Sequence, residues 1–313
     1  MKTLIEHLAF AITCDAADRV IEDASLVVEN DRIVAIGPST EVEQQYPRQS
    51  FDRIIDGRHY GATPGFIDAH VHLLLASSRE ETGGSIRNFG VGPVARIAAN
   101  GGLGSNLVLA HASALGDDEV ELLAEAGTKV AFCPGTSLKL AKGATSIGKY
   151  PEMMAQGITV ALGTDGPSAS GNLSLMRQMY LVAGLFKDAR LDATQVGARQ
   201  ALRMATIDGA RALLLDQLIG SLEAGKKADF VLFDLDHVEW TPYFDPVQSL
   251  VWSASPASIA ETWIDGNRVF FDGRVSTLDE VALRREARER AAALRKRAQL
   301  VAETTSATAE AYN

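Results

Sequence analysis

Two histidines separated by a single residue, His70 and His72, follow an apolar run in the segment PGFIDAHVH. Alternate side chains of an extended strand point to the same side, so both imidazoles would face one point. Zinc and similar ions accept imidazole nitrogens at about 2.0–2.1 Å. The pair is a candidate for part of a metal site, although so short a pattern also occurs as two ordinary histidines near a strand end.

Two further polar residues end other apolar runs. His111 ends the run NLVLAH, and Asp165 ends the run ITVALGTD. Taken alone, the histidine could be a hydrogen-bonded core residue and the aspartate a turn or helix-capping residue. Polar side chains at the carboxyl ends of several parallel strands, however, are what forms the active site of an α/β barrel. Considered with the histidine pair, these residues favour a metal-dependent hydrolase.

The elements that must position these residues follow a repeated strand–helix order. Short apolar runs rich in β-branched and aliphatic residues are typical of parallel strands that are buried on both faces. We expect such strands at 66–72, 106–111, 128–132 and 158–164. Helical segments follow within DDEVELLAEAG, SIGKYPEMMAQG and NLSLMRQMYLVAGLF. The pattern predicts an α/β fold with a parallel sheet or barrel.

Both ends of the chain are rich in hairpins, which predicts one small composite β domain built from 1–63 and 218–277. The α/β catalytic domain, 64–217, would be inserted between these two pieces, and 278–313 would form a charged helix packed on the surface, followed by a tail. The turns that indicate hairpins are Asn30-Asp31, Asp265-Gly266 and Asp272-Gly273.

Composition argues against several function classes. The net charge is −10 over 313 residues, whereas a nucleic-acid-binding protein usually carries a basic face. The two cysteines, Cys14 and Cys133, are far apart and in no CxxC spacing, so a disulfide framework is not expected and a reducing cytoplasm fits best. No run approaches about 18 uninterrupted apolar residues, so we expect no membrane span.

Five motifs in order along the chain carry a family resemblance: PGFIDAHVH, LVLAH, KVAFCPGTSLKLAKG, VALGTDG and GSLEAGKKADFVLFD. Over roughly 1–280 the chain resembles the amidohydrolase superfamily. It is most similar to the cytosine-deaminase-like branch, which includes adenosylhomocysteine/methylthioadenosine deaminases, guanine deaminases and triazine hydrolases. The resemblance implies a (β/α)8 TIM barrel with one divalent metal ion, and a small β-sandwich formed from both chain ends.

The resemblance also implies roles for individual residues. His70 and His72 match the metal-binding pair of the first barrel strand. Asp165 matches the last-strand aspartate, which binds the metal and shuttles a proton, and His111 matches a histidine near the activated water and the substrate. Zinc is the expected ion, with iron or manganese as alternatives. The expected substrate is a small nitrogen heterocycle, such as a purine, pyrimidine or triazine, and a homo-oligomer is expected.

The barrel-like part is too short for the complete fold that the resemblance implies. A (β/α)8 barrel takes about 250 residues, whereas this part runs only from Pro64 to Leu215. We expect strands 2–5 to be poorly represented, with a joint near 73–78 where the family places a third metal histidine and an acid glutamate. Glu80 or Glu81 could serve as the acid only if the loop were rebuilt. The chain alone should bind metal weakly and turn over slowly or not at all.

Three functions remain open at this point. The first is an aminohydrolase, a deaminase acting on carbon–nitrogen bonds other than peptide bonds through metal-activated water. The second is a dechlorinating or amide-cleaving member of the same superfamily. The third is a catalytically impaired remnant that acts as a binding or assembly module.

Overall fold

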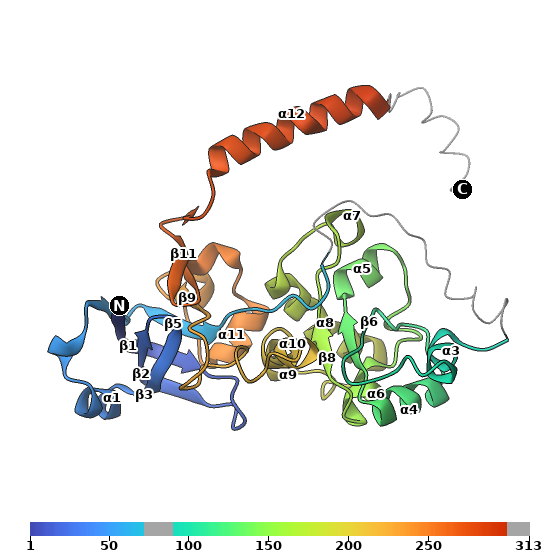
Figure 1. The fold of residues 1–313 in the computed structure, drawn as a ribbon, viewed down its shortest axis with the longest axis horizontal. Coiled ribbons are helices and arrows are strands. Elements are labelled where there is room, and N and C mark those ends of the chain that lie inside the picture. Colours follow the sequence, from blue (N-terminus) through green and yellow to red (C-terminus); the bar gives the residue numbers. More distant parts are fainter. Residues whose placement is uncertain (72–89, 299–313) are drawn as a thin grey trace.

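The computed structural model describes residues 1–71 and 90–298. Figure 1 shows a large β sheet at one end and a helix-rich unit with a small parallel sheet at the other. The large sheet has nine strands in the order β12-β11-β10-β9-β5-β1-β2-β3, with β4 paired to β1. These strands are β1 (Lys2–Ile12), β2 (Val20–Glu29), β3 (Arg32–Pro38), β4 (Arg53–Asp56), β5 (Tyr60–Pro64), β9 (Phe230–Asp234), β10 (Ile259–Ile264), β11 (Asn267–Phe271) and β12 (Arg274–Val275).

The three expected hairpin turns are confirmed. They join β2 to β3, β10 to β11 and β11 to β12. Asp265 and Gly266 both have positive φ, at 49° and 71°, as a two-residue type I′ turn requires. Gly266 also needs the absence of a side chain, because a Cβ there would lie 1.9 Å from the carbonyl oxygen of Asn30.

Segments from both chain ends build the large sheet. β5 pairs antiparallel with β9, which joins the first part of the chain to the last. Near the β3 edge of the sheet, the chain also bonds to the segment that leads into β9: the Gly225 N–H donates to Ile33 O of β3 at 2.8 Å, and the Ala228 N–H donates to O of Asp31, just before β3, at 2.9 Å. The sheet therefore curls on itself around a buried cluster that includes Leu26 and Phe230.

In the described residues the parallel sheet has three strands in the order β6-β7-β8. They are β6 (Val108–Ala110), β7 (Lys129–Phe132) and β8 (Val160–Leu162). The helices are α1 (Ser39–Gln45), α3 (Pro93–Ala99), α4 (Asp117–Ala126), α5 (Pro134–Lys139), α6 (Tyr150–Ala155), α7 (Pro167–Ser170), α8 (Leu175–Arg190), α9 (Ala198–Met204), α10 (Ile207–Ala212), α11 (Pro246–Trp252) and α12 (Glu280–Ala298), with 3-10 turns at Arg48–Ser50, Val238–Trp240 and Pro256–Ser258.

Three of the four expected parallel strands are confirmed, each shorter than expected, as β6, β7 and β8. The fourth, at 66–72, is wrong over 66–71, the part that the structure describes. The Ala69 N–H does donate to Leu162 O at 3.0 Å, so the segment lies beside β8. The Thr164 N–H, however, donates to the carboxylate of Asp68 at 3.0 Å. A side chain thus takes the place of a ladder partner, and the segment stays irregular.

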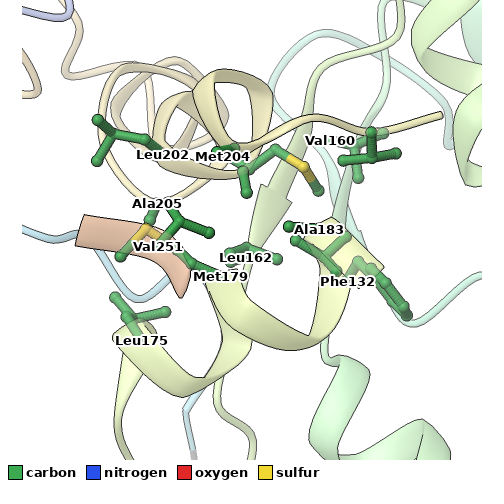
Figure 2. Close-up of a cluster of buried hydrophobic side chains, with 14 of the residues drawn as sticks. Phe132, Val160, Leu162, Leu175, Met179, Ala183, Leu202, Met204, Ala205 and Val251 are labelled. Carbon is green, nitrogen blue, oxygen red and sulfur yellow. The ribbon is translucent and has the colours of Figure 1, made fainter. Parts of the chain in front are cut away.

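The buried side chains between the parallel sheet and its helices form one hydrophobic cluster (Figure 2). Phe132 of β7 and Leu162 of β8 gather there with Met179 of α8, Leu202 of α9 and Val251 of α11. These five side chains are at most 1% exposed. The burial of these large apolar side chains contributes most of the free energy that holds the helices against the sheet.

The same cluster continues into the large sheet. It includes Phe10 of β1 and both Val231 and Phe233 of β9. The two β regions therefore share one hydrophobic core. The expected domain division near residues 63 and 218 stays a prediction, because this core gives no boundary between the two regions.

The expected C-terminal helix is confirmed as α12, but the expected packing on the surface is wrong. No side chain of α12 as far as Arg295 is buried, and Leu283 and Leu294 are each 52% exposed. Figure 1 shows the helix standing away from the rest of the molecule. Within the described part of the chain, no helix combines the length and apolar character that crossing a membrane would need.

His7 links β1 to β2 and α1 and should make stability depend on pH. Its Nδ1 lies 2.8 Å from Asp23 Oδ1 and its Nε2 lies 3.2 Å from Glu43 Oε1. The hydrogen bond to Asp23 raises the pKa of His7 above 6.5 although partial burial opposes the shift. A raised folded-state pKa contributes stability below the unfolded pKa, and this contribution is lost as pH rises through the folded pKa. We expect His7→Asn to cost more unfolding free energy at about pH 5 than at about pH 8.5. Urea unfolding at both pH values checks this, and an equal cost would contradict it.

Candidate metal centre

Three of the residues expected to do chemistry lie together at one edge of the parallel sheet. His111 directly follows β6, Asp165 follows β8, and His70 lies in the segment that runs beside β8. His70 Nε2 is 3.9 Å from Asp165 Oδ1, and His111 Nε2 is 3.5 Å from Asp165 Oδ2. One potential ligand atom from each residue falls within 4.8 Å of the other two. Because β6 and β8 run parallel, their carboxyl ends lie at the same edge, so His111 and Asp165 come together there.

The remaining expected site residue, His72, lies outside the described residues. The same holds for the expected joint at 73–78 and for Glu80 and Glu81. Their roles stay predictions.

Asp165 is held by its backbone as well as by its side chain. Its φ is +59°, its N–H donates to His70 O at 2.8 Å, and its Oδ1 accepts the Gly166 N–H at 2.6 Å. Burial would raise the pKa of this carboxyl, but the Gly166 hydrogen bond and the charges of His111 and His70 lower it below its usual value. Asp165 is therefore an anion at neutral pH, facing two imidazoles.

Close backbone approach allows the histidine segment to reach this edge. At Gly163, a Cβ would lie 2.9 Å from both the Cβ and the carbonyl oxygen of His70, and 3.0 Å from Cys133 Sγ. Real Cβ atoms are essentially never that close to backbone. Gly163 is thus required for His70 to lie against the end of β8.

Sequence reasoning missed Asp68, which fixes the position of His70. Its Oδ1 accepts the backbone N–H groups of His70, at 3.2 Å, and of Thr164, at 3.0 Å. Its Oδ2 accepts the Thr164 hydroxyl at 2.5 Å. One carboxylate therefore ties the histidine segment to the residue before Asp165. The available signal was its place two residues before His70 in PGFIDAHVH.

The donor set fits a divalent ion. Two imidazole nitrogens and one carboxylate oxygen are a ligand combination that catalytic zinc sites use, with a further position left for water or substrate. The carboxylate also supplies the negative charge that offsets part of the charge of a dication. His70, His111 and Asp165 could therefore hold a metal ion.

Comparison with known proteins identifies the family. The model of the amidohydrolase family matches residues 89–269, more than half of the chain. The chain belongs to the amidohydrolase family. A 5-methylthioadenosine/S-adenosylhomocysteine deaminase of Symbiobacterium thermophilum is 37% identical to this amidohydrolase over 307 residues, which cover 90% of the chain and 70% of that protein.

Other curated relatives are longer than this amidohydrolase. The Moorella thermoacetica protein of the same name is 38% identical over 217 residues, 69% of this chain and 50% of that protein. The Acetivibrio thermocellus protein is 34% identical over 68% of this chain and 49% of its own length. The chain thus spans about half the length of these relatives.

Solved structures share the fold. An adenosine deaminase from Xanthomonas campestris, crystallised with bound zinc, has a TM-score of 0.86 at 20% identity and covers 94% of this amidohydrolase and 98% of that chain. The atrazine chlorohydrolase of Arthrobacter aurescens, complexed with zinc, has a TM-score of 0.81 at 18% identity, with 91% and 98% covered. At these identities the likeness establishes the shared fold, which has mixed α/β content.

Removing the charge of Asp68 should weaken metal binding although Asp68 is not proposed as a ligand. In Asp68→Asn, the hydrogen bonds to the His70 and Thr164 amides lose their anionic acceptor, so His70 is held less firmly. Changes of this kind behind a metal ligand typically cost about 10–100-fold in affinity. Zinc titration of the metal-stripped chain measures the loss, and Asp234→Asn is the control because Asp234 accepts an amide from Asp236 elsewhere. Equal zinc affinities in the two variants would contradict the role of Asp68.

Proposed function

We propose that this chain is a metal-dependent aminohydrolase that releases ammonia from a nitrogen heterocycle, such as a purine, pyrimidine or triazine. The observation that carries the proposal is the convergence of His70, His111 and Asp165 from three separate segments on one small volume. The names of the curated relatives, all deaminases of an adenine-containing compound, support the reaction class.

Zinc is the proposed ion, with iron or manganese as alternatives, and His70, His72 and Asp165 would hold it. When bound, such an ion supplies Lewis acidity that makes water nucleophilic at neutral pH. The zinc named for two solved relatives of the same fold supports the choice of metal.

The remaining steps of the reaction are assigned to side chains of this chain. Asp165 lies between His70 and His111, and its carboxylate, which is ionised at neutral pH, can accept a proton from the attacking water as a general base. His111 lies beside the same carboxylate, with Nε2 3.5 Å from Oδ2, and can donate a hydrogen bond to negative charge that develops at the attacked carbon. Asp68 and Gly163 keep His70 in place, as described above.

Ammonia release tests the proposal. The zinc-loaded chain is incubated with a panel of purines, pyrimidines and chlorinated triazines, and ammonia and chloride are both measured, with Asp165→Asn as the negative control. Ammonia release that the control lacks supports the aminohydrolase, even if turnover is slow. Chloride release without ammonia favours the dechlorinating alternative. Neither product, in a chain that binds zinc one-to-one, contradicts the proposed enzyme and favours a binding or assembly module.

We also propose a cytoplasmic homo-oligomer with a small-molecule substrate and no nucleic-acid or membrane partner. The two free, buried cysteines, Cys14 and Cys133, support a reducing cytoplasm, and the net charge of −10 argues against a nucleic-acid partner. The homo-oligomer is proposed from the family resemblance alone. Light scattering coupled to size-exclusion chromatography tests it, and a monomer at micromolar concentration would contradict the oligomer.

A further inference from the structure

The backbone at His111 adopts a rare conformation. The His111 N–H makes the last regular bond at the end of β6, to Ala131 O at 2.8 Å. The next amide, that of Ala112, donates back to Ala110 O at 2.9 Å, and His111 has a φ of +68°. A three-residue turn with an i→i+2 hydrogen bond and a positive central φ is a strained γ-turn. Ala112 is left-handed as well, at +54°. Such strain persists only where surrounding structure holds it.

One buried side chain contacts this turn directly. The Tyr150 hydroxyl donates to the carbonyl oxygen of His111 at 2.5 Å. The Ser113 hydroxyl lies 2.9 Å from the same phenol oxygen. Since the single phenol proton goes to His111, Ser113 is the donor of that second bond. A short chain of hydrogen bonds therefore runs from Ser113 through Tyr150 to the turn.

Tyr150 is itself fixed by the core. It is the first residue of α6, it is 0% exposed, and its ring stacks on Phe132 of β7 at a centroid distance of 3.9 Å. The ring cannot move without disturbing the hydrophobic cluster. Its hydroxyl is therefore a rigid donor. It satisfies the carbonyl oxygen of His111, the central residue of the γ-turn.

We propose that Tyr150 is a positioning residue, whose phenol holds the γ-turn at His111 and so aims the imidazole at Asp165. The effect on catalysis rests on the proposed function, but the control of the turn does not. Tyr150 contacts the candidate metal cluster at the backbone carbonyl of His111, 39 residues away along the chain. It acts only through the backbone of His111.

Amide exchange in the metal-free chain tests the proposal without any activity. Tyr150→Phe keeps the stacked ring and removes the one hydroxyl. We expect the Ala112 amide, which closes the γ-turn, to exchange at least about tenfold faster, a change equivalent to about 1.4 kcal/mol. The Val130 amide, which bonds to Thr159 O within the parallel sheet, is the internal reference for global opening and should stay within about threefold.

Ser113→Ala is the matched control, because it removes a hydroxyl from the same chain of hydrogen bonds but leaves the bond from Tyr150 to His111. We expect its Ala112 exchange to stay near the wild-type rate. Unchanged Ala112 exchange in Tyr150→Phe, or equal acceleration at Ala112 and Val130, would overturn the proposal.

A cobalt(II) titration gives a second readout at the site. With cobalt in place of zinc, Tyr150→Phe should change the visible absorption of the bound ion, because His111 lies 3.5 Å from Asp165, one of its proposed ligands. Ser113→Ala should not change it. If the wild-type chain binds no cobalt, the proposed function is contradicted while the exchange result still decides the role of Tyr150. Cobalt binding with identical spectra in all three proteins would overturn that role.

Discussion

Asp165→Asn should lose zinc affinity by about 100-fold or more and ammonia release by about 10²–10⁴-fold. The amide that replaces the carboxylate is nearly isosteric and can still accept the Gly166 N–H, so the fold is expected to persist. It carries no negative charge, however, and cannot accept a proton from water at neutral pH. The variant therefore separates the charge of this side chain from its structural hydrogen bond.

The matched control for this substitution is Asp229→Asn. Asp229 is also partly buried and also accepts a backbone N–H, from Asp265 at 2.7 Å, but it lies in the large sheet region away from the histidines. Its substitution should leave zinc affinity unchanged. Similar zinc affinities for Asp165→Asn and Asp229→Asn would show that Asp165 does not bind the ion.

The largest effect on stability is expected at Phe132. Its side chain is 1% exposed, stacks on Tyr150 and contacts the ring of Phe186 at a centroid distance of 6.0 Å. Phe132→Ala leaves a cavity where the parallel sheet meets α6 and α8, and we expect it to cost about 3–5 kcal/mol of unfolding free energy. Urea unfolding of the metal-free chain measures this cost.

Phe244→Ala provides the comparison, because Phe244 has the same side chain but is 96% exposed. Its loss should change the unfolding free energy by less than about 0.5 kcal/mol. A cost at Phe132 no greater than that at Phe244 would contradict the shared hydrophobic core as the main source of stability.

The regular elements could be predicted from the sequence because their signals are local. Unbroken apolar runs indicated β6, β7 and β8, and turn residues such as Asp265 and Gly266 indicated the hairpins. Gly127, the last residue of DDEVELLAEAG, has a φ of +66° and ends α4, as is typical of a glycine at a helix C-terminus. The convergence of His111 and Asp165 was also predictable, because parallel strands that end in polar residues share one edge.

Other features could not be predicted because they depend on contacts between distant segments. The Asp68 carboxylate replaces a ladder partner of Thr164, 96 residues away, so an apolar run that reads as a strand is irregular. The γ-turn at His111 depends on the Tyr150 hydroxyl, and the modest preference of histidine for positive φ does not by itself predict a γ-turn there. The exposure of α12 could not be predicted from its sequence either, because alanine and leucine at helical spacing indicate a packed face.

The central claim is that one divalent ion binds at the cluster of His70, His111 and Asp165, with His70 and Asp165 among its ligands and His111 beside it. The most direct test is a crystal of the full chain soaked in zinc, with diffraction data collected on both sides of the zinc absorption edge. We predict one anomalous peak at this cluster, at about 2.0–2.2 Å from a ring nitrogen of His70 and a carboxylate oxygen of Asp165, on the side that faces His111. An anomalous map without a peak there, or imidazoles turned away from that carboxylate, would contradict the account.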